Sequence, residues 1–264
     1  MSYLNTAPLL FSLREAAQKN GWELVEDHPT ALNQALNRGD LDLALVSSFE
    51  YASHWEEYLL IPDVSISATG RVGSVLFFSS KPIDQLHGEL VVLTQASATS
   101  VALLKLLLED FYGQTPCYKM GTLAEGKKGA AYLAIGDEAL RLRRKFPFPK
   151  AYDLAALWME RTHLPFVFAL FAVRRESWAS KARQVRAFAQ ELFLSRARGL
   201  ASLTGLASQC VSLSGLSAGE CLLYLKGIEY DLSGLKQEAL AVFFQHLLRR
   251  REISSYPLLN FVDL

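Results

Sequence analysis

The stretch LPFVFALFAVRR (164–175) decides the fold that we expect, because it is one of the longest apolar runs in the chain. Its apolar part is too short to span a bilayer. Consecutive apolar residues of this length are typical of a strand that is buried on both faces of a sheet. We therefore expect a buried strand here, at the centre of an α/β protein.

Short apolar strands and amphipathic helices alternate on the N-terminal side of this run. Strands are predicted at WELVEDHP (22–29), LDLALVSS (41–48), VGSVLFFSS (72–80), GELVVLT (88–94) and AAYLAI (130–135). Helices are predicted from Pro8 to Asn20, from a Thr30 cap to Gly39, over VALLKLLLEDFYG (101–113), and from Ser177 to the end. Strands that alternate with helices predict an α/β fold.

The order of these elements predicts two α/β lobes joined by two crossing strands. Lobe 1 would comprise residues 1–80 and 169–264, and lobe 2 would be the inserted residues 81–168. The crossings are expected near Ser79 to Pro82 and near Pro165 to Ala169. Two such crossings leave a ligand cleft between the lobes that closes by a hinge.

Composition argues against several classes of function. Lys plus Arg equals Asp plus Glu at 27 each, whereas a nucleic-acid-binding protein needs a basic excess. Three cysteines without a CxxC pair and five scattered histidines predict neither a disulfide framework nor a metal site. The first residues lack the pattern of a signal peptide, so we expect a cytoplasmic protein with no membrane partner.

Five loops are expected at strand ends, and four of them are rich in Ser, Thr, Asn and Gly. They are YLNTAP (3–8), VSSFEY (46–51), SISATGRVGS (65–74), TQASATS (94–100) and IGDEAL (135–140). Ligands of open α/β sheets bind at the carboxyl ends of strands. Hydroxyl-rich loops that lead into helix N-termini favour an anion, so the pattern predicts a small carboxylate-bearing ligand.

Several of these polar residues also have simpler interpretations. Ser97, Thr99 and Ser100 would hold a ligand carboxylate at a helix start, or one of them only caps that helix. Ser47 and Ser48 would bind the ligand or only form the turn after a strand.

The charged residues of the loops leave similar alternatives. Arg71 is the one cation in these loops, and it pairs with a carboxylate of the ligand or is a solvated turn residue. Asp137 and Glu138 act as an acid/base pair or stabilise a helix start. There is no P-loop, GxGxxG, GxSxG or metal-ligand cluster, so the residues alone indicate a two-lobed binder of a small anion.

Six segments in register resemble the chorismate dehydratase family of the futalosine route to menaquinone. They are YLNTAP, GDLDLALVSSFEY, RVGSVLFFSS, TQASATSVALLKLLL, YLAIGDEAL and THLPFVFALF, between residue 3 and about residue 173. The resemblance implies the fold of type II periplasmic solute-binding proteins. It also implies a cofactor-free lyase that removes water from chorismate and gives 3-(1-carboxyvinyloxy)benzoate.

The resemblance further implies that Asn5 lies beside the reacting ring. An amide is not a base at neutral pH, so Asn5 would position or polarise the substrate, and a carboxylate of the substrate itself would take the proton. The substrate-binding residues that we expect are Tyr3, Thr6, Ser47, Ser48, Arg71, Ser74, Ser97, Thr99, Ser100 and Asp137.

The sequence departs from the family at three places. Family members carry a short strand ahead of the YLN motif, whereas only Met1 and Ser2 precede Tyr3 here. ATGRVGS (68–74) replaces an acidic DGPV turn, and His163 stands where the family tends to have Gly. Two other functions compete with the dehydratase: a 1,4-dihydroxy-6-naphthoate synthase-like enzyme and a non-catalytic protein that binds a small carboxylate. The sequence predicts no oligomeric state.

Overall fold

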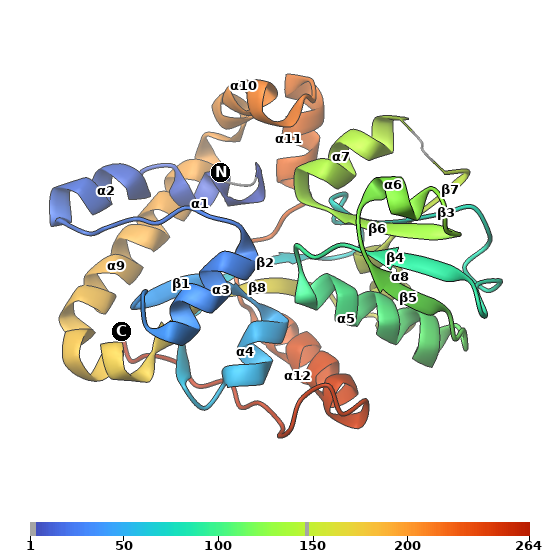
Figure 1. Ribbon diagram of the computed structural model, residues 1–264. Helices are drawn as coiled ribbons and strands as arrows, with labels where there is room; N and C mark the ends of the chain where they lie inside the picture. Colours follow the sequence, from blue (N-terminus) through green and yellow to red (C-terminus); the bar gives the residue numbers. More distant parts are fainter. Residues whose placement is uncertain (1–3, 146–147) are drawn as a thin grey trace.

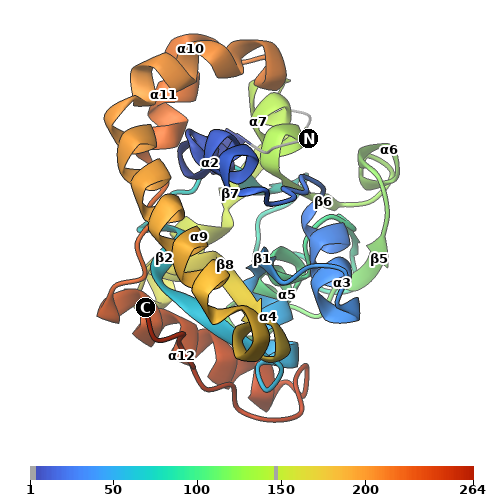
Figure 2. The same cartoon turned by 90° about the vertical axis from the view of Figure 1, so that its left-hand side faces the viewer.

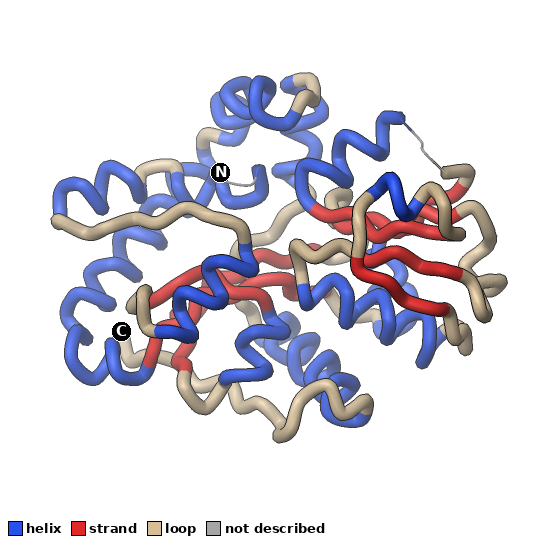
Figure 3. Tube along the Cα trace, in the orientation of Figure 1, coloured by secondary structure: helices blue, strands red, loops and turns tan. Residues whose placement is uncertain are grey.

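The chain folds around two β-sheets that lie side by side (Figures 1 and 3). The computed structural model describes residues 4–145 and 148–264, apart from the side chains of 212–214. One sheet has three strands and the other has five. Helices cover both sheets, as the alternating pattern of the sequence predicts.

The three-stranded sheet is centred on the apolar run quoted above. Its order is β1 (Leu43–Ser47), β8 (Phe166–Arg174) and β2 (Tyr58–Ala68), and both outer strands run antiparallel to β8. Leu170, Ala172 and Val173 of β8 are fully buried. The prediction of a buried strand is therefore confirmed, and β1 is left as an edge strand of this sheet.

The five-stranded sheet contains only residues from the middle of the chain. Its order is β5 (Cys117–Met120), β4 (Leu90–Leu93), β6 (Ala131–Ile135), β3 (Val75–Ser79) and β7 (Lys150–Asp153). β4 pairs in parallel with β5 and β6, whereas β3 pairs antiparallel with β6 and β7. The strands predicted at VGSVLFFSS, GELVVLT and AAYLAI are confirmed.

The first connection between the sheets lies earlier than the sequence analysis expects. β3 belongs to the five-stranded sheet, so the chain crosses between Ala68 and Val75 and not near Ser79 to Pro82. All five residues of β3 are buried, and the strand pairs with β6 and β7 along its two edges. The division into lobes at 80 and 169 stays a prediction, and we propose that its first boundary lies within 69–74.

Helices fill the space around the sheets, and the longest of them, α9, runs beside the three-stranded sheet (Figure 2). The N-terminal helices are η1 (Leu4–Thr6), α1 (Ala7–Leu10), α2 (Leu13–Asn20), α3 (Pro29–Arg38) and α4 (Ser48–His54). The middle ones are α5 (Ala98–Leu106), the π-helical η2 (Leu107–Phe111), α6 (Leu123–Gly126), α7 (Gly136–Lys145) and α8 (Leu154–Thr162). The last four are α9 (Arg175–Ala201), α10 (Leu203–Ser214), α11 (Ala218–Lys226) and α12 (Gly234–Arg249). Over the part of the chain described, no helix has both the length and the apolar character that a membrane span requires.

Two predictions near the N-terminus are wrong. WELVEDHP forms no strand, because the run that follows Gly21 has no neighbouring strand to pair with. The N-cap of α3 is His28 and not Thr30, because Pro29 occupies the first helical position, where its missing N–H costs nothing. Gly39 ends α3 in the left-handed conformation, as predicted.

Candidate functional site

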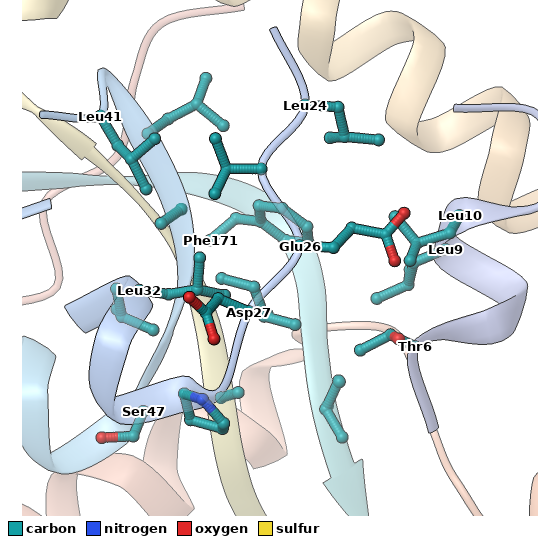
Figure 4. Close-up of a pocket in the computed structure, with 18 of the residues that line it drawn as sticks. Thr6, Leu9, Leu10, Leu24, Glu26, Asp27, Leu32, Leu41, Ser47 and Phe171 are labelled. Carbon is teal, nitrogen blue, oxygen red and sulfur yellow. The ribbon is translucent and has the colours of Figure 1, made fainter. Parts of the chain in front are cut away.

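A cavity of about 580 Å³ lies where the polar ends of several strands and helices meet. It is lined by at least one residue from each of the five polar loops. These residues include Asn5, Thr6, Ser47, Ile66, Val72, Ser74, Ser97, Ser100, Ile135 and Gly136. Figure 4 shows Thr6 and Ser47 on two sides of this space. Residues from both sheets thus form one site, which is the arrangement that a cleft between two lobes requires.

Asn5 has the least satisfied polar side chain of the cavity lining. Its Oδ1 is buried and has no hydrogen-bond partner. Its main-chain carbonyl oxygen accepts a hydrogen bond from the Tyr230 hydroxyl at 2.8 Å. A buried acceptor without a partner is costly, so Asn5 carries an unmet hydrogen bond in the wall of the cavity.

The start of α5 contributes three of the predicted residues. Ser97 caps the helix, because its Oγ accepts the amide hydrogen of Ser100 at 3.1 Å and its hydroxyl donates to the Ser100 Oγ at 3.0 Å. Thr99 is 1 % exposed, and its Oγ1 accepts from the amide of Phe49 at 2.8 Å. Ser97 and Ser100 line the cavity, whereas Thr99 ties the start of α5 to α4 outside it.

The two serines after β1 differ in their surroundings. Ser47 lines the cavity and caps α4, with its Oγ accepting from the amide of Glu50 at 3.2 Å. Ser48 is fully buried, and its hydroxyl donates to the carbonyl oxygen of Val167 at 2.7 Å. Ser48 does not belong to the cavity lining.

The connection between the sheets places Ser74 and Arg71 differently. Ser74 lines the cavity, and its Oγ accepts a hydrogen bond from the Tyr224 hydroxyl at 2.9 Å. Its carbonyl oxygen accepts from the amide of Gly136 at 2.7 Å, which joins two walls of the site. Arg71 is exposed and lies outside the cavity lining.

Asp137 contacts the N-terminal turn at Leu4 and does not belong to the cavity lining. Burial raises the pKa of Asp137, against the opposing effects of Arg141 and of a hydrogen bond from the Leu4 main chain. Asp137 therefore connects the start of α7 to η1, directly beside Asn5. Glu138 accepts a hydrogen bond from the Tyr132 hydroxyl at 3.0 Å. Tyr3 lies outside the described residues.

Sequence reasoning missed two kinds of supporting residue. Asp153 caps α8, and its carboxylate also accepts from the amides of Val72 and Gly73 at 3.2 and 2.7 Å. The helical pattern that begins after Asp153 is a signal that could have revealed this cap. Tyr224 and Tyr230 come from the C-terminal part of the chain, where no sequence pattern marks them.

The charges around the cavity are unevenly distributed. Carboxylates line it from the run after α2 and from the segment before β1: Glu23, Glu26, Asp27, Asp40 and Asp42. Among the described lining residues Lys181 is the one Lys or Arg, and its Nζ lies 2.8 Å from Asp42. The walls that carry Ser74, Ser97 and Ser100 present uncharged hydroxyl groups, two of them at the start of α5, so an anion is favoured there. In the described chain no group of three His, Cys, Asp or Glu residues is suited to a metal ion.

Much of the rest of the cavity lining is apolar. Leu9, Leu13, Val185 and Phe188 line it from the helices. Every residue of 21–27 and of 41–47 also lines it, and Figure 4 shows Leu24 and Leu41 toward the same end. Because successive side chains of an extended chain point to opposite faces, two unbroken lining runs present their main-chain edges to the cavity.

Comparison with known proteins identifies the family. The model of a family described as menaquinone biosynthesis matches residues 1–249. A chorismate dehydratase from Thermus thermophilus is 35 % identical over 262 residues, which cover 93 % of this chain and 92 % of that protein. A chorismate dehydratase from Campylobacter jejuni is 34 % identical over 176 residues, covering 65 % of each protein. The resemblance seen in the sequence is confirmed.

Solved structures confirm the fold. A protein from Archaeoglobus fulgidus superposes with a TM-score of 0.73 at 19 % identity, covering 95 % of this chain and 96 % of the other. An alkanesulfonate-binding protein from Xanthomonas axonopodis pv. citri gives a TM-score of 0.66 at 16 % identity, covering 97 % and 93 %. The fold is that of type II periplasmic-binding proteins, with two lobes, as the sequence predicts. The chain belongs to the menaquinone-biosynthesis family.

Proposed function

We propose that this chain is a chorismate dehydratase that eliminates water from chorismate in the cavity between the two sheets. Two relatives at 34–35 % identity are named chorismate dehydratase, which supports this reaction over the alternatives. The observation that carries the proposal for the site is the buried, unpartnered Oδ1 of Asn5 in the cavity lining.

Asn5 has the chemistry to orient the reacting part of the substrate. In the reaction the C4 hydroxyl leaves, the C3 proton is removed and the ring becomes aromatic. Aromatisation supplies a large driving force, so the protein mainly has to position groups and handle two protons. The Asn5 Oδ1 accepts a hydrogen bond from the substrate hydroxyl and so orients it, and the proton that is taken from C3 leaves with this hydroxyl as water.

The substrate carboxylates are bound by neutral donors. Ser97 and Ser100 at the start of α5 line the cavity, whereas the amide of Gly136 at the start of α7 already donates to the Ser74 carbonyl oxygen. A helix start of this kind favours an anion without supplying a full positive charge. Arg71 is exposed outside the lining, so in this proposal it does not pair with the substrate in the conformation described.

A carboxylate of the substrate is the proposed base. Asp137, the carboxylate that the sequence analysis considered as an acid or base, accepts a hydrogen bond from the Leu4 main chain and lies outside the cavity lining. It is therefore engaged in holding the turn that carries Asn5. No cofactor enters this scheme, and the cytoplasmic location expected from the sequence stays a prediction.

An ultraviolet assay with purified protein and chorismate tests the reaction. The expected result is loss of chorismate with formation of 3-(1-carboxyvinyloxy)benzoate, identified by its mass. Tight binding of chorismate without turnover would instead support a non-catalytic binder, a function that the fold shared with an alkanesulfonate-binding protein allows. Turnover of a naphthoate precursor but not of chorismate would support the synthase-like alternative.

The roles of Asn5 and Asp137 are separated by two variants. Asn5→Ala should lower kcat at least about 100-fold, because it removes the positioning acceptor. Asp137→Asn should lower kcat less than about tenfold, because an amide oxygen still accepts from the Leu4 main chain. Asn20→Ala, at an exposed position of α2 outside the cavity lining, is the matched control and should leave kcat unchanged. The reverse ranking would make Asp137 the base.

A further inference from the structure

Two buried tyrosines reach the walls of the site from the C-terminal part of the chain. Tyr230 is 3 % exposed and Tyr224 is 8 % exposed. Their hydroxyls donate to the Asn5 carbonyl oxygen and to the Ser74 Oγ. Neither tyrosine belongs to the cavity lining, so neither touches a ligand held there.

The main chain of Tyr230 is itself held in place. Its carbonyl oxygen accepts from the amide of Ser65 at 3.3 Å and from the Arg196 side chain at 3.0 Å. The preceding residue, Glu229, exchanges two main-chain hydrogen bonds with Ser67 of β2. The Tyr230 hydroxyl therefore projects from a segment that is paired with β2, an outer strand of the three-stranded sheet.

The turn that Tyr230 contacts has little structure of its own. η1 spans three residues, Leu4–Thr6, and so is too short to fix its own orientation. Its Leu4 main chain is bonded to Asp137 and its Asn5 carbonyl oxygen to Tyr230. These two contacts lie on either side of the Asn5 Cα and together set the direction of its side chain.

We infer that Tyr230 is a positioning residue for the dehydration reaction, which acts by fixing the Asn5 turn so that Oδ1 faces the substrate. The inference rests on the proposed function, because it gives Asn5 its role. Burial raises the pKa of Tyr230 well above its usual value, so the hydroxyl remains a donor over the whole range of the assay. A displacement of about 1 Å at a reacting group is enough to lower a rate about 100-fold.

The test is Tyr230→Phe, which removes one oxygen and keeps the buried ring. We expect kcat to fall between about tenfold and 100-fold while KM changes less than about threefold, because the proposed carboxylate donors, Ser97 and Ser100, belong to α5 and not to the Asn5 turn. Tyr256→Phe is the matched control, since Tyr256 is 40 % exposed, lies outside the cavity lining and donates its hydroxyl to the Ala241 carbonyl oxygen. Its kcat and KM should equal those of the starting protein.

A double-mutant cycle separates positioning from a general loss of structure. If Tyr230 acts through Asn5, Tyr230→Phe should lower kcat less than about twofold in an Asn5→Ala background. An equal loss of kcat in both backgrounds would overturn the inference. A rise in KM with unchanged kcat for Tyr230→Phe alone would also overturn it.

A measurement without substrate keeps this inference distinct from the proposed function. Hydrogen exchange of the segment Leu4–Leu10 should become at least about threefold faster in Tyr230→Phe, with exchange in the five-stranded sheet unchanged. If the starting protein does not consume chorismate, the proposed function fails, and the exchange result still decides whether Tyr230 holds the turn. Unchanged exchange at Leu4–Leu10 would show that it does not.

Discussion

The tripeptide Glu-Leu-Val occurs at 23–25 and again at 89–91, with two different outcomes. In the second copy Leu90 begins β4, and Val91 pairs with Tyr118 of β5 and Ala131 of β6. In the first copy the chain is extended but forms no strand. Val91 is fully buried, whereas Val25 is 42 % exposed. The same local preference thus gives a strand only where neighbouring strands supply hydrogen-bond partners.

The surroundings of the first copy explain the difference. β1 is the edge strand of the three-stranded sheet, and the cavity lies between β1 and the run 21–27. Both runs present their main-chain edges to the cavity. The cavity separates them, so they do not pair with each other as strands. An edge without a partner leaves its amides exchangeable and its side chains weakly packed.

Hydrogen exchange should show the largest contrast between the two copies. We expect the amides of Val91–Leu93 to exchange roughly 10³-fold more slowly than those of Leu24 and Val25, because only the former are bonded within a sheet. Exchange followed by NMR or by mass spectrometry of short peptides measures this ratio. Similar rates at the two sites would show that the 23–25 run is as protected as a strand.

Shortening the valine in each copy should give the next largest effect. Val91→Ala should lower the free energy of unfolding by about 2 kcal/mol, from two lost methyl groups and the space they leave. Val25→Ala should change it by less than about 0.5 kcal/mol, because this side chain remains largely in water. Urea denaturation of the two variants measures the difference, and equal losses would contradict the comparison.

Supplying a partner strand for the 22–27 run should reduce the difference in hydrogen-exchange rate between the two copies of the tripeptide. An alternating apolar segment of about six residues fused to the N-terminus can pair with β1 and with the 22–27 run across the cavity. We expect exchange at Leu24 and Val25 to slow at least about tenfold. The control carries a central proline in the fused segment, which removes a main-chain donor. If both fusions act alike, the missing partner is not the reason that 23–25 forms no strand.

The smallest effect concerns β5, the edge strand that pairs with β4. Lys119 of β5 lies 2.8 Å from Glu125, and its hydrogen bond lowers the pKa of that carboxyl from 4.5 to about 2. A lowered pKa stabilises the fold above pH 4.5, and this contribution is lost as the pH falls toward 2. Glu125→Gln should therefore lower Tm slightly at pH 6 and not at pH 2. Glu15→Gln on exposed α2 is the control, and a constant Tm difference at all pH values would contradict this assignment.

Much of the fold was predictable because local signals and tertiary contacts agree. Leu43–Ser47, Leu90–Leu93 and Phe166–Arg174 are apolar runs that become strands with partners. β2 was not predicted, because Pro62 and Asp63 interrupt its pattern where the pairing register shifts between Leu60 and Ser65. The 22–29 prediction is wrong because a sequence pattern does not reveal whether a neighbouring strand is present.

The site was predictable only at the level of its loops. Strand ends rich in hydroxyl groups indicated where the cavity would lie, and Asn5, Ser47, Ser74, Ser97 and Ser100 line it. Which serines are already used could not be read from the sequence: Ser48 donates to Val167, a residue 119 positions away. Tyr230 was missed for the same reason, since its partner Asn5 lies 225 positions away.

The hydrogen bond between Tyr230 and Asn5 also has a consequence for how the protein is made. Translation proceeds from the N-terminus at about 5–20 residues per second, so Asn5 leaves the ribosome tens of seconds before Tyr230. The Ser12 amide likewise donates to the Ser195 Oγ, at 2.9 Å, 183 positions later. The five-stranded sheet, built from residues 75–153, is complete well before these contacts can form. The turn that carries Asn5 is thus among the first parts to be synthesised and among the last to reach its final position.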